Sequence, residues 1–79
     1  MGERMALYVQ DAPESEWRLV AECGGLGVNQ AREMASEQLE RTVADGAPNP
    51  RAGWLRNRPG SDPFPEKLPP NAALEQVMP

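Results

Sequence analysis

The sequence predicts an α+β fold in which a small antiparallel β-hairpin packs on one α-helix and a Pro-rich, extended C-terminal tail follows. Three observations lead to this prediction. The chain has 79 residues, enough for one small domain. The apolar spacing changes from two residues to three or four residues across the Gly-rich stretch 24–27. Eight of the nine prolines come after Gly46, so we divide the chain into a folded part, 1–46, and a tail, 47–79.

Residues 5–10 form the first expected strand. In an extended chain Met5, Leu7 and Val9 point to one side and Tyr8 points to the other. Residues 11–15, Asp-Ala-Pro-Glu-Ser, have the composition of a turn. A strand that ends at a turn predicts a hairpin with the segment that follows.

Residues 16–23 form the second expected strand. Four apolar residues alternate with mostly polar ones, which is the pattern of a strand with one buried face. We therefore place all four on the buried face: Trp17, Leu19, Ala21 and Cys23. The glycines that follow end the strand, because glycine weakens a strand interior.

A helix is expected between Asn29 and Gly46. Asn29 is a suitable N-cap, and Gly46 is a suitable residue for the left-handed turn that ends a helix. The apolar face recurs at three- and four-residue spacing: Ala31, Met34, Ala35, Leu39, Thr42 and Val43. The opposite face is charged, and Glu37 and Arg41 have the spacing of a favourable pair.

The tail is expected to be extended or disordered over residues 57–71, because proline removes a backbone donor and disfavours helix in the residue before it. A turn or two of helix is expected within 71–77. Trp54 and Leu55 are a strong apolar pair that we expect to fold back on the sheet or to pair as a short third strand.

The composition excludes several classes of protein. A single cysteine allows no intramolecular disulfide, and the absence of histidine removes the commonest metal ligand and the usual general base. We therefore expect no metal, no cofactor, no catalytic residues and no enzymatic activity. No segment has the length of apolar sequence that a membrane span or a signal peptide needs, so we expect a cytoplasmic protein that does not contact membranes.

Two local features have some properties of catalytic or ligand sites, but we expect both to have structural roles. The stretch Gly24-Gly25-Leu26-Gly27 precedes a helix, but it lacks the spacing of a phosphate-binding loop. Cys23 has no histidine to activate it, so we interpret it as a packed thiol.

The segment 51–58 is the most distinctive chemistry in the chain. It combines Trp54 with Arg51, Arg56 and Arg58 and contains no acidic residue. Arginine and tryptophan together are typical of binding surfaces. The competing structural interpretation is that Trp54 completes the core while the arginines balance the acidic helix.

The helix supplies a second candidate surface, which contains Glu33, Glu37 and Glu40. Residues 1–46 carry nine acidic residues and four arginines, a net charge of −5, whereas residues 47–79 have a net charge of +1. An acidic chain is not attracted to phosphate, so the sequence favours a protein partner and disfavours nucleic acid.

In size, charge and hairpin-then-helix order, residues 1–46 resemble the small acidic inhibitor proteins of phages and mobile elements, anti-CRISPR proteins among them. This resemblance transfers no functional residue. We expect a non-catalytic protein that binds another macromolecule and inhibits it by occlusion, through the seven charged and aromatic residues named above. The alternatives are an accessory subunit whose tail becomes ordered in an assembly and, more weakly supported, a mimic of nucleic acid. A homodimer is also compatible with the apolar surface that a hairpin and one helix leave uncovered.

Overall fold

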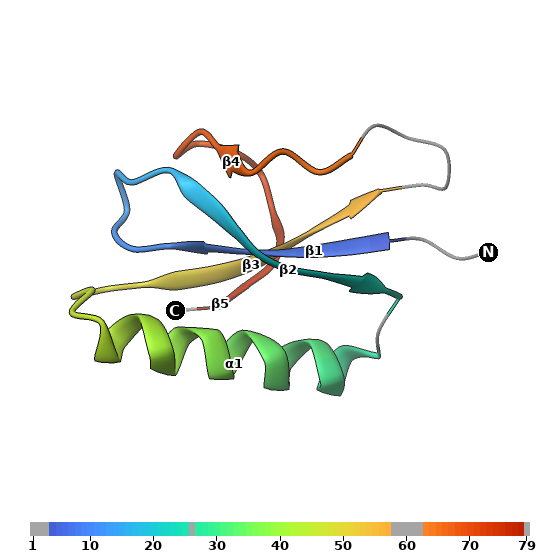
Figure 1. Cartoon of the computed structure of the whole chain (residues 1–79), viewed down its shortest axis with the longest axis horizontal. Helices are drawn as coiled ribbons and strands as arrows, with labels where there is room; N and C mark the ends of the chain where they lie inside the picture. Colours follow the sequence, from blue (N-terminus) through green and yellow to red (C-terminus); the bar gives the residue numbers. More distant parts are fainter. Residues whose placement is uncertain (1–3, 26, 58–62, 79) are drawn as a thin grey trace.

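The structure, a computed structural model, is a five-stranded antiparallel sheet with a helix on one face and the C-terminal segment on the other (Figure 1). It describes residues 4–25, 27–57 and 63–78. The elements are β1 (Arg4–Gln10), β2 (Trp17–Gly24), α1 (Val28–Ala44), β3 (Arg51–Asn57), β4 (Lys67–Leu68) and β5 (Glu75–Met78). The strand order is β4-β2-β1-β3-β5, so β1 lies at the centre of the sheet.

The α+β class is confirmed, but the sheet is larger than the predicted hairpin. Trp54 and Leu55 lie in β3, which pairs along the whole length of β1, so the third strand is confirmed. The prediction missed β4 and β5 because they are short and are flanked by prolines. Residues on both sides of position 46, where the composition changes, therefore share one sheet.

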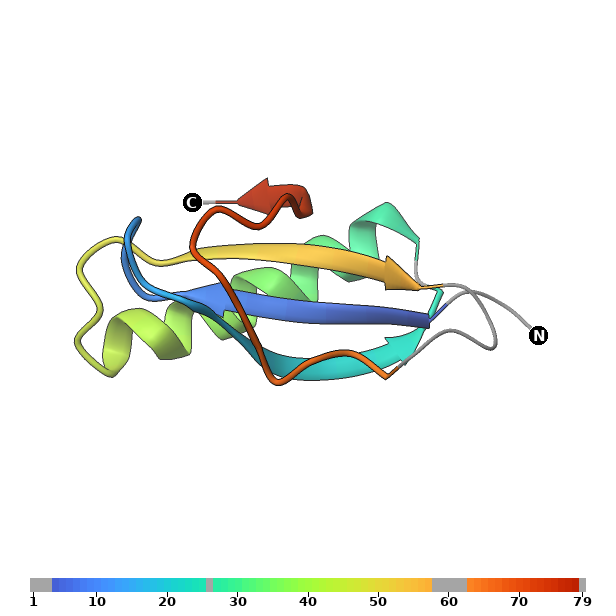
Figure 2. The ribbon, with the colours of Figure 1, turned by 90° about the horizontal axis from the view of Figure 1, so that it is seen from above.

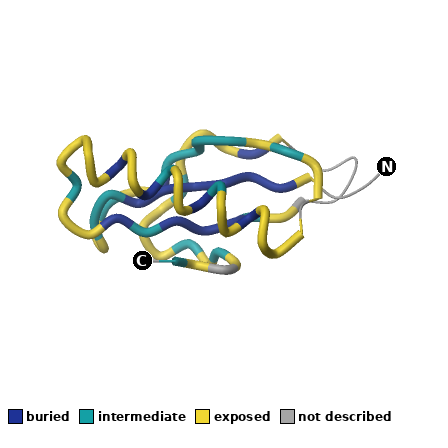
Figure 3. The backbone as a smooth tube through the Cα atoms, turned by 90° about the horizontal axis from the view of Figure 1, so that it is seen from below, coloured by how far each residue is buried: buried dark blue, intermediate teal, exposed yellow. Residues whose placement is uncertain are grey.

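β1 is buried on both faces of the sheet. Met5, Leu7 and Val9 face α1 and Tyr8 faces the other way, as predicted. Every residue from Met5 to Gln10 is buried, and Figure 3 shows the central strands as dark blue segments between exposed ones. A strand in this position needs a cover on each face of the sheet.

β2 contains a bulge that the alternating sequence pattern conceals. Leu7 pairs with Ala21 whereas Tyr8 pairs with Leu19, which leaves Val20 as an extra residue. An extra residue reverses the side-chain alternation beyond it. The prediction that Trp17, Leu19, Ala21 and Cys23 share one face is therefore wrong. Trp17 and Leu19 face away from α1, whereas Ala21 and Cys23 face it.

α1 packs a narrow apolar stripe on the sheet. The buried residues of the helix are Ala31, Ala35, Leu39 and Thr42. The N-cap is Gly27, which has no side chain to cap the helix, so the prediction of Asn29 is wrong by two positions. The C-terminal end agrees with the prediction, because Gly46 has a left-handed φ of 104°. The N–H groups of Gly46 and Ala47 donate to the carbonyls of Val43 and Thr42 at 3.0 and 3.2 Å, which is a Schellman motif.

Residues 63–74, which we call the strap, cover the face of the sheet opposite α1. The strap runs beside β2 as β4 and then crosses the sheet toward β5, at the other edge (Figure 2). Its Phe64 is buried in a cluster with Ala6, Tyr8 and Trp17. Residues 63–71 are mainly extended, which is one of the two expected alternatives, but they pack on the sheet. The helix expected within 71–77 is instead the strand β5. The strap also covers the apolar face that made a homodimer plausible.

Side chains of the sheet donate hydrogen bonds to carbonyls of the strap. The prolines of the strap have no backbone N–H, so they can only accept. The hydroxyl of Tyr8 donates to the carbonyl of Pro65 at 2.7 Å. The indole N–H of Trp17 and the amide of Gln10 each donate to the carbonyl of Pro70 at 3.4 Å. The backbone contributes the short antiparallel pairing of β4 with β2, and beside it the Leu19 N–H donates to the carbonyl of Glu66 at 2.9 Å.

Candidate functional site

Trp54 lies in the core rather than at the surface. Its side chain is 1% exposed and belongs to the cluster between the sheet and α1. The structural interpretation of this residue therefore describes its position correctly, and the indole cannot touch a partner in this conformation.

Arg51 is held by the protein itself. Its guanidinium donates to Oε1 of Gln10 from two nitrogens, at 2.7 and 3.1 Å, and lies 5.5 Å from the centre of the Trp17 ring. Gln10 is fully buried, and its amide donates to the carbonyls of Pro13 and Ser15 at 3.1 and 2.8 Å. Arg51 thus joins the start of β3 to the β1–β2 turn.

Arg56 also has an intramolecular partner. Its Nε lies 3.2 Å from the carboxylate of Glu75, which links β3 to β5 at the edge of the sheet. Arg58 lies outside the described residues. The sequence grouped these three arginines as one binding surface, but the two that the structure describes are engaged in different contacts.

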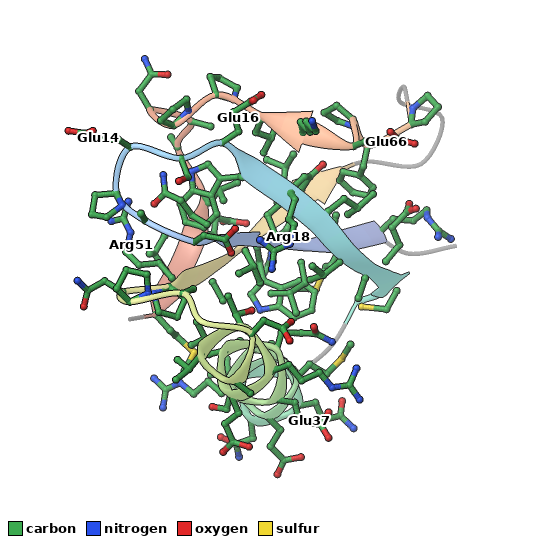
Figure 4. All side chains as sticks on the ribbon, turned by 60° about the vertical axis from the view of Figure 1, so that its left-hand side comes forward. Glu14, Glu16, Arg18, Glu37, Arg51 and Glu66 are labelled. Atoms are coloured by element: carbon green, nitrogen blue, oxygen red, sulfur yellow. The ribbon has the colours of Figure 1, made fainter. Side chains whose placement is uncertain are left out.

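The acidic face of α1 is defined by Glu33, Glu37 and Glu40, all exposed. These residues line a shallow depression on the helix together with Arg32, Met34 and Ser36. Figure 4 shows Glu37 on the side of the helix that points away from the sheet. Within the described part of the chain, none of the three carboxylates forms a hydrogen bond or an ion pair, and the expected Glu37–Arg41 pair is not formed.

A groove lies beside the acidic face, at the C-terminal end of α1. It is open, has a volume of about 530 Å³ and is mostly apolar. Its lining residues are Pro13, Leu39, Glu40, Val43, Pro48, Asn49, Pro50 and Arg51. Sequence analysis missed this groove because it treated Pro48 and Pro50 as the start of a tail. The signal that could have revealed it is Val43, which ends the apolar stripe of α1 but is 56% exposed.

A second group of exposed carboxylates lies outside α1. Glu14 and Glu16 belong to the β1–β2 turn and Glu66 precedes β4. Figure 4 shows the three at the edge of the molecule opposite Glu37. They carry the same charge as the acidic face but do not line the groove, although Glu14 directly follows Pro13, which does.

Cys23 is half-buried near the end of β2. Burial raises the pKa of its thiol above the ordinary value, and the charge of Arg4 opposes this shift more weakly. The thiol is therefore protonated near neutral pH, and a protonated thiol is a poor nucleophile. Among the described residues, no three potential metal ligands gather at one place, and no helix has the length and apolar character to cross a membrane.

The chain matches no protein-family model, no curated protein and no solved structure. The surface described above is therefore the basis for assigning a function.

Proposed function

We propose that this chain is a non-catalytic binding protein that docks the acidic face of α1 on a basic surface of another protein and blocks that surface by occlusion. One observation carries the proposal. The carboxylates of Glu33, Glu37 and Glu40 are exposed and have no partner among the described residues, whereas every arginine described on the strands has one.

Charge placed in this way favours association rather than folding. Exposed carboxylates remain hydrated and contribute little to stability. Their field attracts a basic partner and orients it during encounter. The three side chains span about 10 Å of one helix face, from the rise of 1.5 Å per residue. A rigid helix therefore presents them in a fixed arrangement.

The chemistry of the remaining surface supports a non-catalytic role. The sequence contains no histidine to act as a base near neutral pH. Cys23 carries a thiol whose pKa is raised by burial. A protein of net charge −4 is repelled by phosphate, so we favour a protein partner over a nucleic acid.

The proposal is tested with two charge-reversed proteins that are matched to each other. Glu37→Lys with Glu40→Lys changes the acidic face, and Glu16→Lys with Glu66→Lys makes the same change in net charge at the opposite edge. A partner captured with the wild-type protein from the cells that produce it is identified and purified, and its affinity for each protein is measured by calorimetry at low salt.

We expect the change on α1 to weaken binding by about tenfold or more, which corresponds to about 1.4 kcal/mol. The change at the opposite edge should weaken it much less, and both proteins should melt near the wild-type temperature. Equal affinities for the two variants would show that only net charge matters and would remove α1 as the docking surface. If nucleic acid displaces this chain from its partner, the chain binds a nucleic-acid site, and the alternative that it mimics nucleic acid is correct.

A further inference from the structure

We propose that the groove at the end of α1 binds an aromatic side chain of the partner, in a segment whose Lys or Arg residues lie toward Glu37 and Glu40. This inference rests on the proposed function, because it names the chemistry of the segment that the acidic face attracts. The ligand class is thus a basic protein segment with one aromatic anchor.

The walls of the groove suit a flat apolar ring. Leu39 and Val43 line it from the helix, and Pro48, Pro50 and Pro13 line it from the two turns. Proline and aromatic rings pack well on each other, which is the basis of many peptide-binding grooves. A volume of about 530 Å³ lies in the usual range of ligand pockets.

Contacts within the protein hold the walls of the groove in place. The Schellman motif fixes the end of α1, and Pro50 is buried. Arg51 is clamped between Gln10 and Trp17 at the start of β3. A site that is already ordered loses little conformational entropy on binding, which raises its affinity for a given contact area.

The charges on two sides of the groove give the bound segment a direction. Glu40 lines both the groove and the depression of the acidic face, so the two surfaces are continuous. Arg51, at the start of β3, lines the groove from the sheet. Basic residues of the partner therefore fit on the helix side of the anchor, and its other side must be neutral or acidic.

The position of Val43 supports this assignment. It is 56% exposed, whereas Leu39, four residues earlier on the same helix, is buried. Val28, at the other end of α1, is 53% exposed and does not line the groove. At a rise of 1.5 Å per residue, it lies about 22 Å from Val43 along the helix axis. The two valines make a matched pair for a test.

The probe is a capped peptide, Lys-Lys-Ser-Phe-Ser-Gly, compared with Lys-Lys-Ser-Ser-Ser-Gly. Each is titrated into the isotope-labelled full chain, and binding is followed by backbone amide shifts. We expect the Phe peptide to bind about threefold more tightly or better and to shift Leu39, Val43 and residues 47–51. The Val43→Gln protein should bind both peptides equally, whereas the Val28→Gln protein should behave as the wild type.

Several results would overturn the inference. If both peptides bind equally and shift only the amides around Glu33, Glu37 and Glu40, the groove takes no anchor but the proposed function stands. If neither peptide shifts the amides of α1, both the inference and the basic-partner proposal fail. If sedimentation shows a dimer of the wild type that Val43→Gln dissociates, a second copy of the chain occupies the groove and the inference is wrong.

Discussion

The two faces of the sheet are covered by different means. On one face, α1 supplies its own backbone hydrogen bonds and packs Ala31, Ala35 and Leu39 on β1 and β3. On the other face, four of the twelve strap residues are prolines, and the strap is held by its short pairing with β2 and by the side chains of Tyr8, Gln10 and Trp17. The backbone hydrogen bonds of the helix are thus internal and its contact with the sheet is apolar packing, whereas the strap is held by hydrogen bonds from the sheet.

This difference decides which surface is open to a partner. The strap closes the face that carries Tyr8 and Trp17, so the apolar residues there are used for folding. None of the described residues covers the outer side of α1, which carries the unpartnered carboxylates and borders the groove at its C-terminal end. Variants that affect one face at a time can therefore separate folding from binding.

We expect the largest loss of stability from Trp54→Ala, which removes a buried side chain from the face of the sheet that α1 covers. Truncation of a buried aromatic residue costs about 3 to 5 kcal/mol, most of the stability of so small a domain. Urea denaturation followed by circular dichroism measures the change. A protein that keeps wild-type stability would contradict the burial of this side chain.

Gly53→Ala should lower the stability of the protein by disturbing only the face of the sheet that the strap covers. A Cβ at position 53 would lie 2.9 Å from Cβ of Leu74 in the strap, so the strap must move. Overpacking of this kind costs about 1 to 3 kcal/mol. The matched control is Gly24→Ala, because no atom lies within 4 Å of the added Cβ.

Amide shifts distinguish these two glycine variants. The Gly53→Ala protein should show changes along residues 63–78 while α1 keeps its wild-type shifts. Large changes in α1, or none in the strap, would mean that the two covers are not independent.

Tyr8→Phe should lower the free energy of unfolding by less than Gly53→Ala does. It removes one hydrogen bond to Pro65, at a cost of about 0.5 to 1.5 kcal/mol. Burial, and to a lesser degree the charge of Glu22, raises the pKa of the Tyr8 hydroxyl above 10.0. The folded state therefore holds this proton more tightly than the unfolded state, and the resulting stability is present below pH 10 and is lost as the pH rises further.

Unfolding curves at pH 8 to 11 test the contribution of this hydroxyl. The wild-type protein should lose more stability above pH 10 than Tyr8→Phe does. Parallel declines in the two proteins would show that the hydroxyl titrates alike in both states.

The smallest effect is expected from Cys23→Ala, on the helix-covered face. Cys23 is half-buried and its thiol is protonated near neutral pH, so the variant should lose some packing but keep its affinity for the partner. Loss of activity by a protein that remains folded and equally stable would contradict a non-catalytic role. Calorimetry with the captured partner provides the measurement.

Sequence predicted the helix-covered face better than the strap-covered face, for a physical reason. The spacing of Ala31, Ala35 and Leu39 and the glycine at position 46 are local signals, and both agree with the structure. The strap depends on contacts across the chain, such as Tyr8 with Pro65, which no local pattern contains. The prolines of the strap are exposed, and the strap docks through the carbonyls of Pro65 and Pro70 and through the buried Phe64.

The candidate site shows the same division. The exposure of Glu33, Glu37 and Glu40 could be predicted from helical spacing alone. The role of Arg51 could not, because its partner Gln10 lies 41 positions earlier in the chain. Alternation also failed in β2, where the bulge at Val20 moves Ala21 and Cys23 to the other face.

The most direct test of this account is the hydrogen exchange of one amide in the free protein. The N–H of Leu19 points to the edge of β2 and donates to Glu66, so its protection reports whether the strap is docked. We predict that this amide is protected at neutral pH, together with the amides of β1. If Leu19 exchanged as fast as an exposed amide while β1 stayed protected, the strap would be open, and the face with Tyr8 and Trp17 would replace α1 as the binding surface.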